Sequence, residues 1–254
     1  MPAATVVPGV ARLLAALGSV RDPELDEPIT SLGFVAACAI SAEGDAEIRL
    51  RLPTYFCAPN FAYLMAADAY DAVTALPGVR TVRVLLADHF AADAINSGVA
   101  AQAGFVQSFS GEAAGELDDL RTSFLRKAVL AGTDQVCRAL RAGDVVPAGA
   151  SGLALLQTLT LAEVPPSPAA ERLRRRRAEL GLPADDDALL LLDPATGDPV
   201  EESVVPLHLR RARLTAISIE ANASICRGML RHRYSSPGIG EIPPGTTDPG
   251  EETP

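Results

Sequence analysis

The sequence predicts an α+β fold: a small three-stranded sheet with helices on one face, followed by a mainly helical second domain with a short hairpin. Three segments with the β pattern lie within the first 90 residues, and an amphipathic helical stretch separates the second from the third. After residue 90 the apolar residues recur mainly at helical spacing. We therefore expect one domain at residues 1–90, a mainly helical extension at 91–234 and a disordered tail at 235–254.

The first predicted element is a short helix at residues 8–18. Its apolar residues fall at helical spacing and Gly18 ends it: Val10, Leu13, Leu14 and Leu17.

The sheet follows. Residues 34–40 are apolar, and residues 47–52 alternate strictly between apolar and charged side chains, so one face of that strand is buried. The loop "SAEGD" joins the two as a hairpin. From residue 59 to about 74 the apolar positions follow a period of 3.6, which predicts a helix, and "VRTVRVLL" at 79–86 then predicts the third strand.

The extension should contain a long amphipathic helix from residue 116 to Gly143 and a shorter one at 171–182. The stretch "ALLLLDPATGDPV" at 188–200 combines an apolar run with a turn, so we expect a strand and a hairpin there. A last helix is expected from Leu207 to about Tyr234, and the Pro-, Gly- and Thr-rich tail has too little apolar content to fold.

Composition excludes several classes of protein. The formal net charge is -10, whereas nucleic-acid binding needs clustered positive charge. An uninterrupted apolar stretch of about 18 residues is missing, which argues against a membrane span. The N-terminus has no basic region before its apolar part and does not resemble a secretory signal, so we expect a cytoplasmic protein.

Cys57 is the main candidate for chemistry. In "PTYFCAPNFAYLM" (53–65), Pro59 has the place of a first helical residue, so Ala58 is the N-cap and Cys57 lies just outside the first turn. Free N–H groups and the positive end of the helix dipole favour a thiolate there, as a metal ligand or a nucleophile. The alternative is a small, buried, apolar cysteine.

Three motifs in order resemble the iron-sulfur cluster assembly family that includes SufT and PaaD. They are "DPELDEPITSLGFV", "LPTYFCAP" and "LPGVRTVRVLL", and the resemblance covers roughly residues 8–88. The family usually has Pro directly after its Cys, whereas here Ala58 intervenes.

The resemblance implies a role for each matching residue. Cys57 would be the reactive or iron-coordinating thiol, Asp22 and Glu24 would lie near it, and Thr54 would shape the loop. It further implies iron or an iron-sulfur cluster as a transiently held cofactor.

His89 is the second-tier metal candidate. It follows the third strand directly, at a place where loops carry function, so Cys57, His89 and one carboxylate would suit iron or zinc. The alternative for His89 is a hydrogen-bonding residue, and the alternative for Asp22, which precedes Pro23, is the N-cap of a single turn.

Glu220 is the exception in a nearly uncharged helical stretch at 214–230, which should be largely buried. A buried carboxylate needs a cation, a metal or a proton. We expect an ion pair with Arg227, seven residues further on, and regard metal ligation as the alternative.

The remaining marked residues have simpler interpretations. Cys38, Cys137 and Cys226 are expected to be core residues. The arginine run at 174–177 is typical of a solvated helix face, and it could also dock an acidic partner.

These observations predict a non-enzymatic accessory or maturation factor. Its first domain would present Cys57 to iron or a nascent iron-sulfur cluster, and its extension would recognise a client metalloenzyme, for which the resemblance suggests a bacterial di-iron monooxygenase. One rival is a stable structural partner or subunit of that oxygenase without a metal of its own. Another is a thiol enzyme that uses Cys57 with His89 as base. A homodimer is also considered, whereas nucleic acid and membrane are not expected partners.

Overall fold

The computed structural model describes residues 7–113, 115–143, 145–146 and 149–234, so the predicted disordered tail at 235–254 lies outside the described residues. The chain divides into two compact units. The first unit contains the described residues up to Asp22, then Glu27–Glu116, and then the chain from Ile225 onward. The second contains Pro23–Asp26 and Leu117–Ser224.

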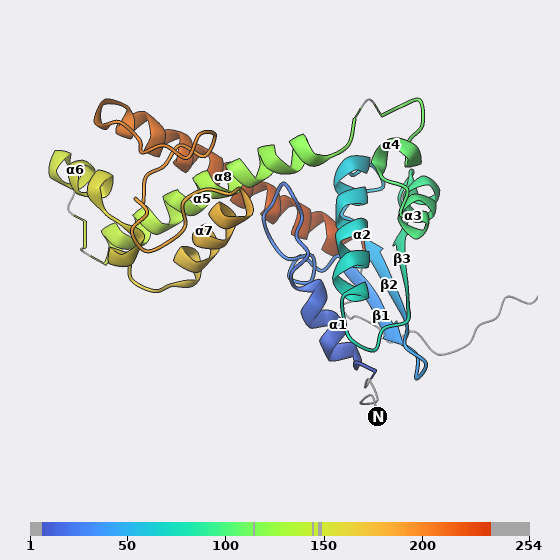
Figure 1. The fold of residues 1–254 in the computed structure, drawn as a ribbon. Helices are drawn as coiled ribbons and strands as arrows, with labels where there is room; N and C mark the ends of the chain where they lie inside the picture. The colour runs from blue at the N-terminus through green and yellow to red at the C-terminus, as the bar shows by residue number, and fades with distance from the viewer. Residues whose placement is uncertain (1–6, 114, 144, 147–148, 235–254) are drawn as a thin grey trace, which may run out of the picture. The chain divides into compact units, whose positions relative to one another are not determined.

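The first unit is built on the predicted three-stranded sheet, with β1 (Val35–Ile40), β2 (Asp45–Arg51) and β3 (Thr81–Ala87) in that order (Figure 1). The hairpin strands β1 and β2 are antiparallel, whereas β2 and β3 are parallel. A parallel pair needs a crossover connection, and the helix between β2 and β3 supplies it.

Helices cover this sheet: α1 (Val10–Leu17), the crossover helix α2 (Pro59–Thr74), α3 (Ala92–Ala101) and the single turn α4 (Phe105–Ser108). The predicted helices at 8–18 and 59–74 are confirmed, whereas α3 and α4 were not predicted. Their shared core is apolar, with side chains at most 5% exposed, among them Leu13, Leu17, Ile48, Leu50, Met65, Val73, Val84, Leu86 and Ile95.

The second unit is mainly helical, as predicted. It contains α5 (Asp118–Ala142), α6 (Ala150–Thr158), the short turn η1 (Leu161–Glu163), α7 (Pro168–Glu179), the short turn η2 (Glu202–Val204) and most of α8 (Val205–Arg233). The two long predicted helices therefore form with nearly the expected bounds. The last part of α8, from Ile225, belongs to the first unit.

The hairpin expected at 188–200 is reduced to one antiparallel bridge between Leu192 and Pro199, and the predicted strand before it does not form. The physical reason lies in α7. Arg177 donates hydrogen bonds to the carbonyl oxygens of Leu189 (2.8 Å) and Leu190 (2.5 Å), so a side chain takes acceptors that a strand partner would use.

The interpretation of the arginine run as a solvated helix face is wrong for two of its members. Arg177 is fully buried, and burial together with the nearby charge of Arg174 lowers its pKa to about 10. Arg176 is buried as well and forms an ion pair with Asp26 at 2.5 Å. Two of the four arginines are therefore internal to the second unit.

The expectation of a largely buried stretch at 214–230 is also wrong. Apolar side chains of α8 are exposed there: Leu214, Ile217, Ile225 and Met229.

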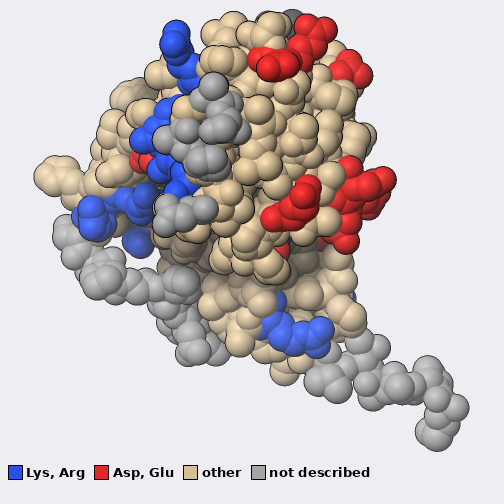
Figure 2. Space-filling view, turned by 90° about the vertical axis from the view of Figure 1, so that its left-hand side faces the viewer, with Lys and Arg blue, Asp and Glu red and all other residues tan. Residues whose placement is uncertain are grey.

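No helix within the described ranges is both long and apolar enough to cross a membrane. On the face that Figure 2 draws, acidic and basic side chains gather in separate groups.

Candidate functional site

The site begins at the start of α2, where the sequence places Cys57. Pro59 is the first residue of the helix and Ala58 is its N-cap, as predicted, and no side chain caps the helix there. Cys57 therefore precedes the unsatisfied N–H groups of the first turn, and its side chain is partly exposed.

The Thr54 hydroxyl lies 3.2 Å from the Cys57 sulfur. The same hydroxyl oxygen accepts a hydrogen bond from the backbone N–H of Phe56 at 3.2 Å. That N–H can only donate, so the hydroxyl keeps its own proton, and either the hydroxyl or the thiol can be the donor in the contact between the two side chains. Thr54 thus shapes the loop and contacts the Cys57 sulfur.

His89 holds the other side of the loop. It follows β3, it is buried, and its Nε2 lies 2.7 Å from the carbonyl oxygen of Cys57. Its Nδ1 accepts the N–H of Ala91 at 3.2 Å, so the neutral Nε2–H tautomer satisfies both contacts. Burial, with the charge of Arg233 as a smaller cause, lowers the pKa of His89 against the opposing effect of the bond to Cys57.

His89 therefore matches the hydrogen-bonding alternative. The fold places His89, at the end of β3, next to the backbone of Cys57. Both of its ring nitrogens contact backbone groups there. It positions the loop that carries the thiol.

The end of α8 supplies a brace that sequence reasoning missed. The Arg233 guanidinium donates to the carbonyl oxygens of Leu52 (3.2 Å) and Asp88 (2.6 Å), one before the Cys57 loop and the other just before His89. Tyr234 donates its hydroxyl to the Asp88 carboxylate at 3.2 Å. These partners are 145 to 181 positions apart in sequence, so no local pattern could have revealed them.

Three exposed aromatic side chains flank the thiol. Phe56, which precedes Cys57, is 76% exposed, and Tyr55 and Phe90 are also exposed. Their rings form one group, with centroids 5.0 to 6.3 Å apart. Exposed aromatic groups of this kind are typical of surfaces that bind another protein.

The two carboxylates of the family motif fall in different units. Asp22 belongs to the first unit, is buried, and donates its backbone N–H to the carbonyl oxygen of Glu27. Glu24 belongs to the second unit, where its carboxylate accepts a hydrogen bond from the side chain of Asn222 at 3.3 Å.

The expectation for Glu220 needs correction. Its side chain is 51% exposed and pairs with Arg138 at 3.0 Å, whereas Arg227 pairs with Glu27 at 2.6 Å. The predicted pairing with a cation is thus right, and the predicted burial and the predicted partner are wrong. The error arises because α8 exposes apolar residues beside Glu220 instead of burying them.

The other cysteines separate clearly from Cys57. Cys38 and Cys137 are buried, as predicted, and burial raises their pKa values to about 11 and about 12, so both remain thiols. Cys226 is only partly buried, contrary to expectation. Among the described residues, no three His, Cys, Asp or Glu side chains gather as a set that could hold a metal ion.

A protein-family model matches part of the chain. The model of the iron-sulfur cluster assembly protein family matches residues 11–85, which include Asp22, Thr54 and Cys57. Searches of curated proteins and of solved structures found no match to the chain. The segment formed by residues 11–85 therefore belongs to the iron-sulfur cluster assembly protein family.

Proposed function

We propose that the protein is a non-enzymatic maturation factor that acts in the cytoplasm and uses Cys57 to assist iron or iron-sulfur assembly in a client metalloenzyme. The observation that carries this proposal is the setting of Cys57 within the family segment: partly exposed, at a helix N-terminus, and 3.2 Å from the Thr54 hydroxyl. These features suit a thiolate that binds a cargo and releases it.

The cargo must receive further ligands from elsewhere. Within the residues described, Cys57 has no neighbouring set of metal-binding side chains, and both nitrogens of His89 are engaged with the backbone. One thiolate can hold iron or a cluster only as part of a shared ligand set. The client, or a second copy of this chain in a homodimer, would supply the rest.

The client would dock on apolar surface. The aromatic group of Tyr55, Phe56 and Phe90 lies beside the thiol, and the second unit exposes Leu207 and Leu214 on α8. Contact at the aromatic group would bring the client to the cargo, while the extension would select which client is served. A di-iron monooxygenase remains our proposal for that client.

Two other functions are alternatives to this proposal. A structural partner of the oxygenase would use the same apolar surfaces without needing Cys57. A thiol enzyme is less well supported, because His89 contacts the Cys57 carbonyl oxygen and no hydrogen bond joins its ring to the sulfur in the described structure.

The test is metal and acid-labile sulfide analysis of the client, isolated without oxygen from cells that carry the parent chain, Cys57→Ser or Cys226→Ser. Cys226→Ser is the matched control, since Cys226 is also partly buried. We expect Cys57→Ser still to bind the client but to leave it with several-fold less iron, and the control to behave like the parent. Full iron occupancy with Cys57→Ser would replace metal delivery by the structural-partner function.

A further inference from the structure

The described chain ends beside the aromatic group. Arg233 donates hydrogen bonds to the carbonyl oxygens of Leu52 at 3.2 Å and Asp88 at 2.6 Å. Leu52 lies three residues before the first ring of the group, and Asp88 lies two residues before the last. The Tyr234 hydroxyl contacts the Asp88 carboxylate at 3.2 Å. Residues 235–254 therefore continue from a point next to the segments that carry the rings.

The aromatic group is an exposed apolar surface at the thiol. Its rings, on Tyr55, Phe56 and Phe90, have centroids 5.0 to 6.3 Å apart. Covering them would remove apolar area from water, which is favourable. Cys57 follows Phe56 directly and is partly exposed, so a segment that lies on the rings also restricts access to the thiol.

The tail contains a segment that suits such a surface. Residues 237–244 read "PGIGEIPP" and contain both isoleucines of the tail, Ile239 and Ile242, together with three prolines. Proline-rich segments favour the polyproline II conformation, which has three residues per turn, and they dock on surfaces lined by aromatic rings. Because Ile239 and Ile242 are three residues apart, one side of such a segment would present both to the rings.

The segment is long enough to reach the rings. Ile239 and Ile242 lie five and eight residues beyond Tyr234, so an extended chain can place them up to about 17 Å and about 26 Å from it. Asp88, which Tyr234 contacts, is at most about 7 Å from Phe90 between Cα atoms. A short tether gives an effective concentration in the millimolar range, so a weak contact suffices.

Charge favours the same contact. The tail has four carboxylate side chains and no Lys or Arg: Glu241, Asp248, Glu251 and Glu252. The last turn of α8, from which the tail continues, carries Arg231, His232 and Arg233. Opposite charges at these distances attract each other and keep the tail near the end of α8.

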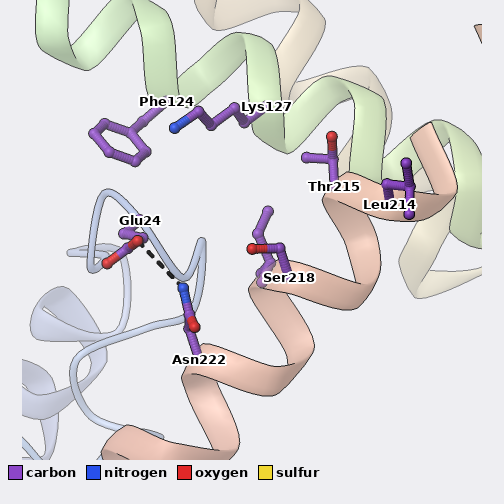
Figure 3. Close-up of a pocket in the computed structure, with 8 residues that line it drawn as sticks. Glu24, Phe124, Lys127, Leu214, Thr215, Ser218 and Asn222 are labelled. Carbon is purple, nitrogen blue, oxygen red and sulfur yellow. Dashed lines mark hydrogen bonds between the residues drawn. The ribbon is translucent and has the colours of Figure 1, made fainter. Parts of the chain in front are cut away.

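The second unit offers the segment a more mixed surface. Leu214 is exposed on α8, and Figure 3 shows the hydroxyl-bearing side chains of Thr215 and Ser218 on the same stretch of that helix. The aromatic group instead brings three rings together, so it can bury more apolar area against two isoleucines.

We propose that residues 237–244 lie on the aromatic group in the free protein and partly cover Cys57. Ile239 and Ile242 contact the rings, and a client must displace the segment before it can contact the same rings. This regulatory role rests on the proposed function, whereas the contact itself needs neither iron nor a client.

Alkylation of Cys57 tests the contact. The full-length protein reacts with iodoacetamide at one fixed pH, without iron or client, and mass spectrometry of the digested protein gives the rate at Cys57 separately from the other cysteines. If the segment covers the thiol about two-thirds of the time, a chain that ends at Tyr234 should react about threefold faster. That factor corresponds to about 0.7 kcal/mol, which leaves the stability of the sheet nearly unchanged.

Further variants separate the contact from local effects. Ile239→Ser combined with Ile242→Ser in the full chain should raise the rate as the truncation does. A chain that ends at Gly245 keeps the segment and should react like the full chain. Phe90→Ser should remove most of the difference between the full chain and the chain that ends at Tyr234, because the segment loses part of its surface. Thermal melting confirms that each variant folds.

Three outcomes overturn the proposal. The first is an equal rate at Cys57 in the full chain, the chain that ends at Tyr234 and the double isoleucine variant. The second is a faster rate on truncation that the isoleucine variant does not reproduce. The third is protection that disappears on dilution, which would assign the segment to a second copy of the chain. Since the iron content of the client is measured separately, failure of this contact is distinguishable from failure of metal delivery.

Discussion

At the residue scale, the neutral His89 ring links the end of β3 to the Cys57 loop through one donated and one accepted hydrogen bond. A second proton on the ring would occupy Nδ1 and face the N–H of Ala91, so the imidazolium form would lose that bond. The uncharged ring makes both hydrogen bonds and the protonated ring loses one of them, so the strength of this contact depends on pH.

Stability should fall in mild acid for this reason. The folded-state pKa of His89 is lowered, chiefly by burial, so below about pH 6.5 the unfolded chain binds the proton first. The free energy of unfolding then decreases as pH falls from that value towards the folded-state pKa, by up to about 1.4 kcal/mol per pH unit. His89→Gln removes the titrating group.

Urea unfolding at about pH 7.5 and about pH 5.5 measures this effect. We expect His89→Gln to lose less stability between the two values than the parent, and His232→Gln, at an exposed position, to lose as much as the parent. Equal pH dependence in all three proteins would show that His89 does not titrate in this range.

The position of Cys57 just before α2 could be predicted from the sequence, because Pro59 and Ala58 mark the start of the helix. Thr54 followed from the family resemblance. Arg233 could not be predicted, since its contact to Leu52 joins positions 181 apart and no local pattern records a contact of that range.

At the scale of elements, α7 is the clearest case of one helix that shapes another segment. No carboxylate among the described residues pairs with Arg177. Its guanidinium group instead donates hydrogen bonds to two carbonyl oxygens of the segment after α7. Those carbonyl groups would otherwise be left buried without a partner.

Arg177→Met should therefore lower the free energy of unfolding by about 2–4 kcal/mol, because each orphaned buried acceptor costs about 1–3 kcal/mol. Arg175→Met, two positions earlier and exposed, should change it by less than about 0.5 kcal/mol. Denaturant titration of both variants gives the comparison. A similar effect from both changes would mean that the run acts through total charge and not through buried hydrogen bonds.

Elements with strong periodicity were predictable and those shaped by tertiary partners were not. The helices α2 and α5 formed with nearly the expected bounds, since their apolar spacing alone specifies them. The strand expected at 188–200 failed because periodicity cannot show that Arg177 takes its carbonyl groups.

At the scale of the whole molecule, the first unit depends on residues from the far end of the chain. From α8 it receives Arg227, which pairs with Glu27, the buried Leu230, and Arg233. These contacts complete a unit whose sheet ends before residue 90.

Two truncations separate this contribution from that of the tail. A chain that ends at Ser224 should lose at least about 3 kcal/mol of unfolding free energy in the first unit, because burial of Leu230 alone is worth about 2–5 kcal/mol. A chain that ends at Tyr234 should keep the parent's stability, as the low apolar content of residues 235–254 implies. Hydrogen exchange of the strands, read by mass spectrometry, gives the measurement, and equal protection in the two chains would contradict it.

The α+β class and the helical extension were predictable because both rest on local patterns. The assignment of Pro23–Asp26 to the second unit was not, since it depends on the Arg176–Asp26 pair and the Asn222–Glu24 bond, which join distant positions. Resemblance of a segment to a family says little about which neighbours its motif will contact.

The discontinuous first unit also has a consequence for synthesis on the ribosome. The chain leaves the ribosome from its N-terminus, and domains usually fold as units while they emerge. The sheet and Cys57 emerge early, but Ile225 and the residues after it appear only once the whole of Leu117–Ser224 has been translated. The second unit, whose motif loop is already outside, can therefore fold first, and the Cys57 loop reaches its final setting only after Leu117–Ser224 and the end of α8 have been made.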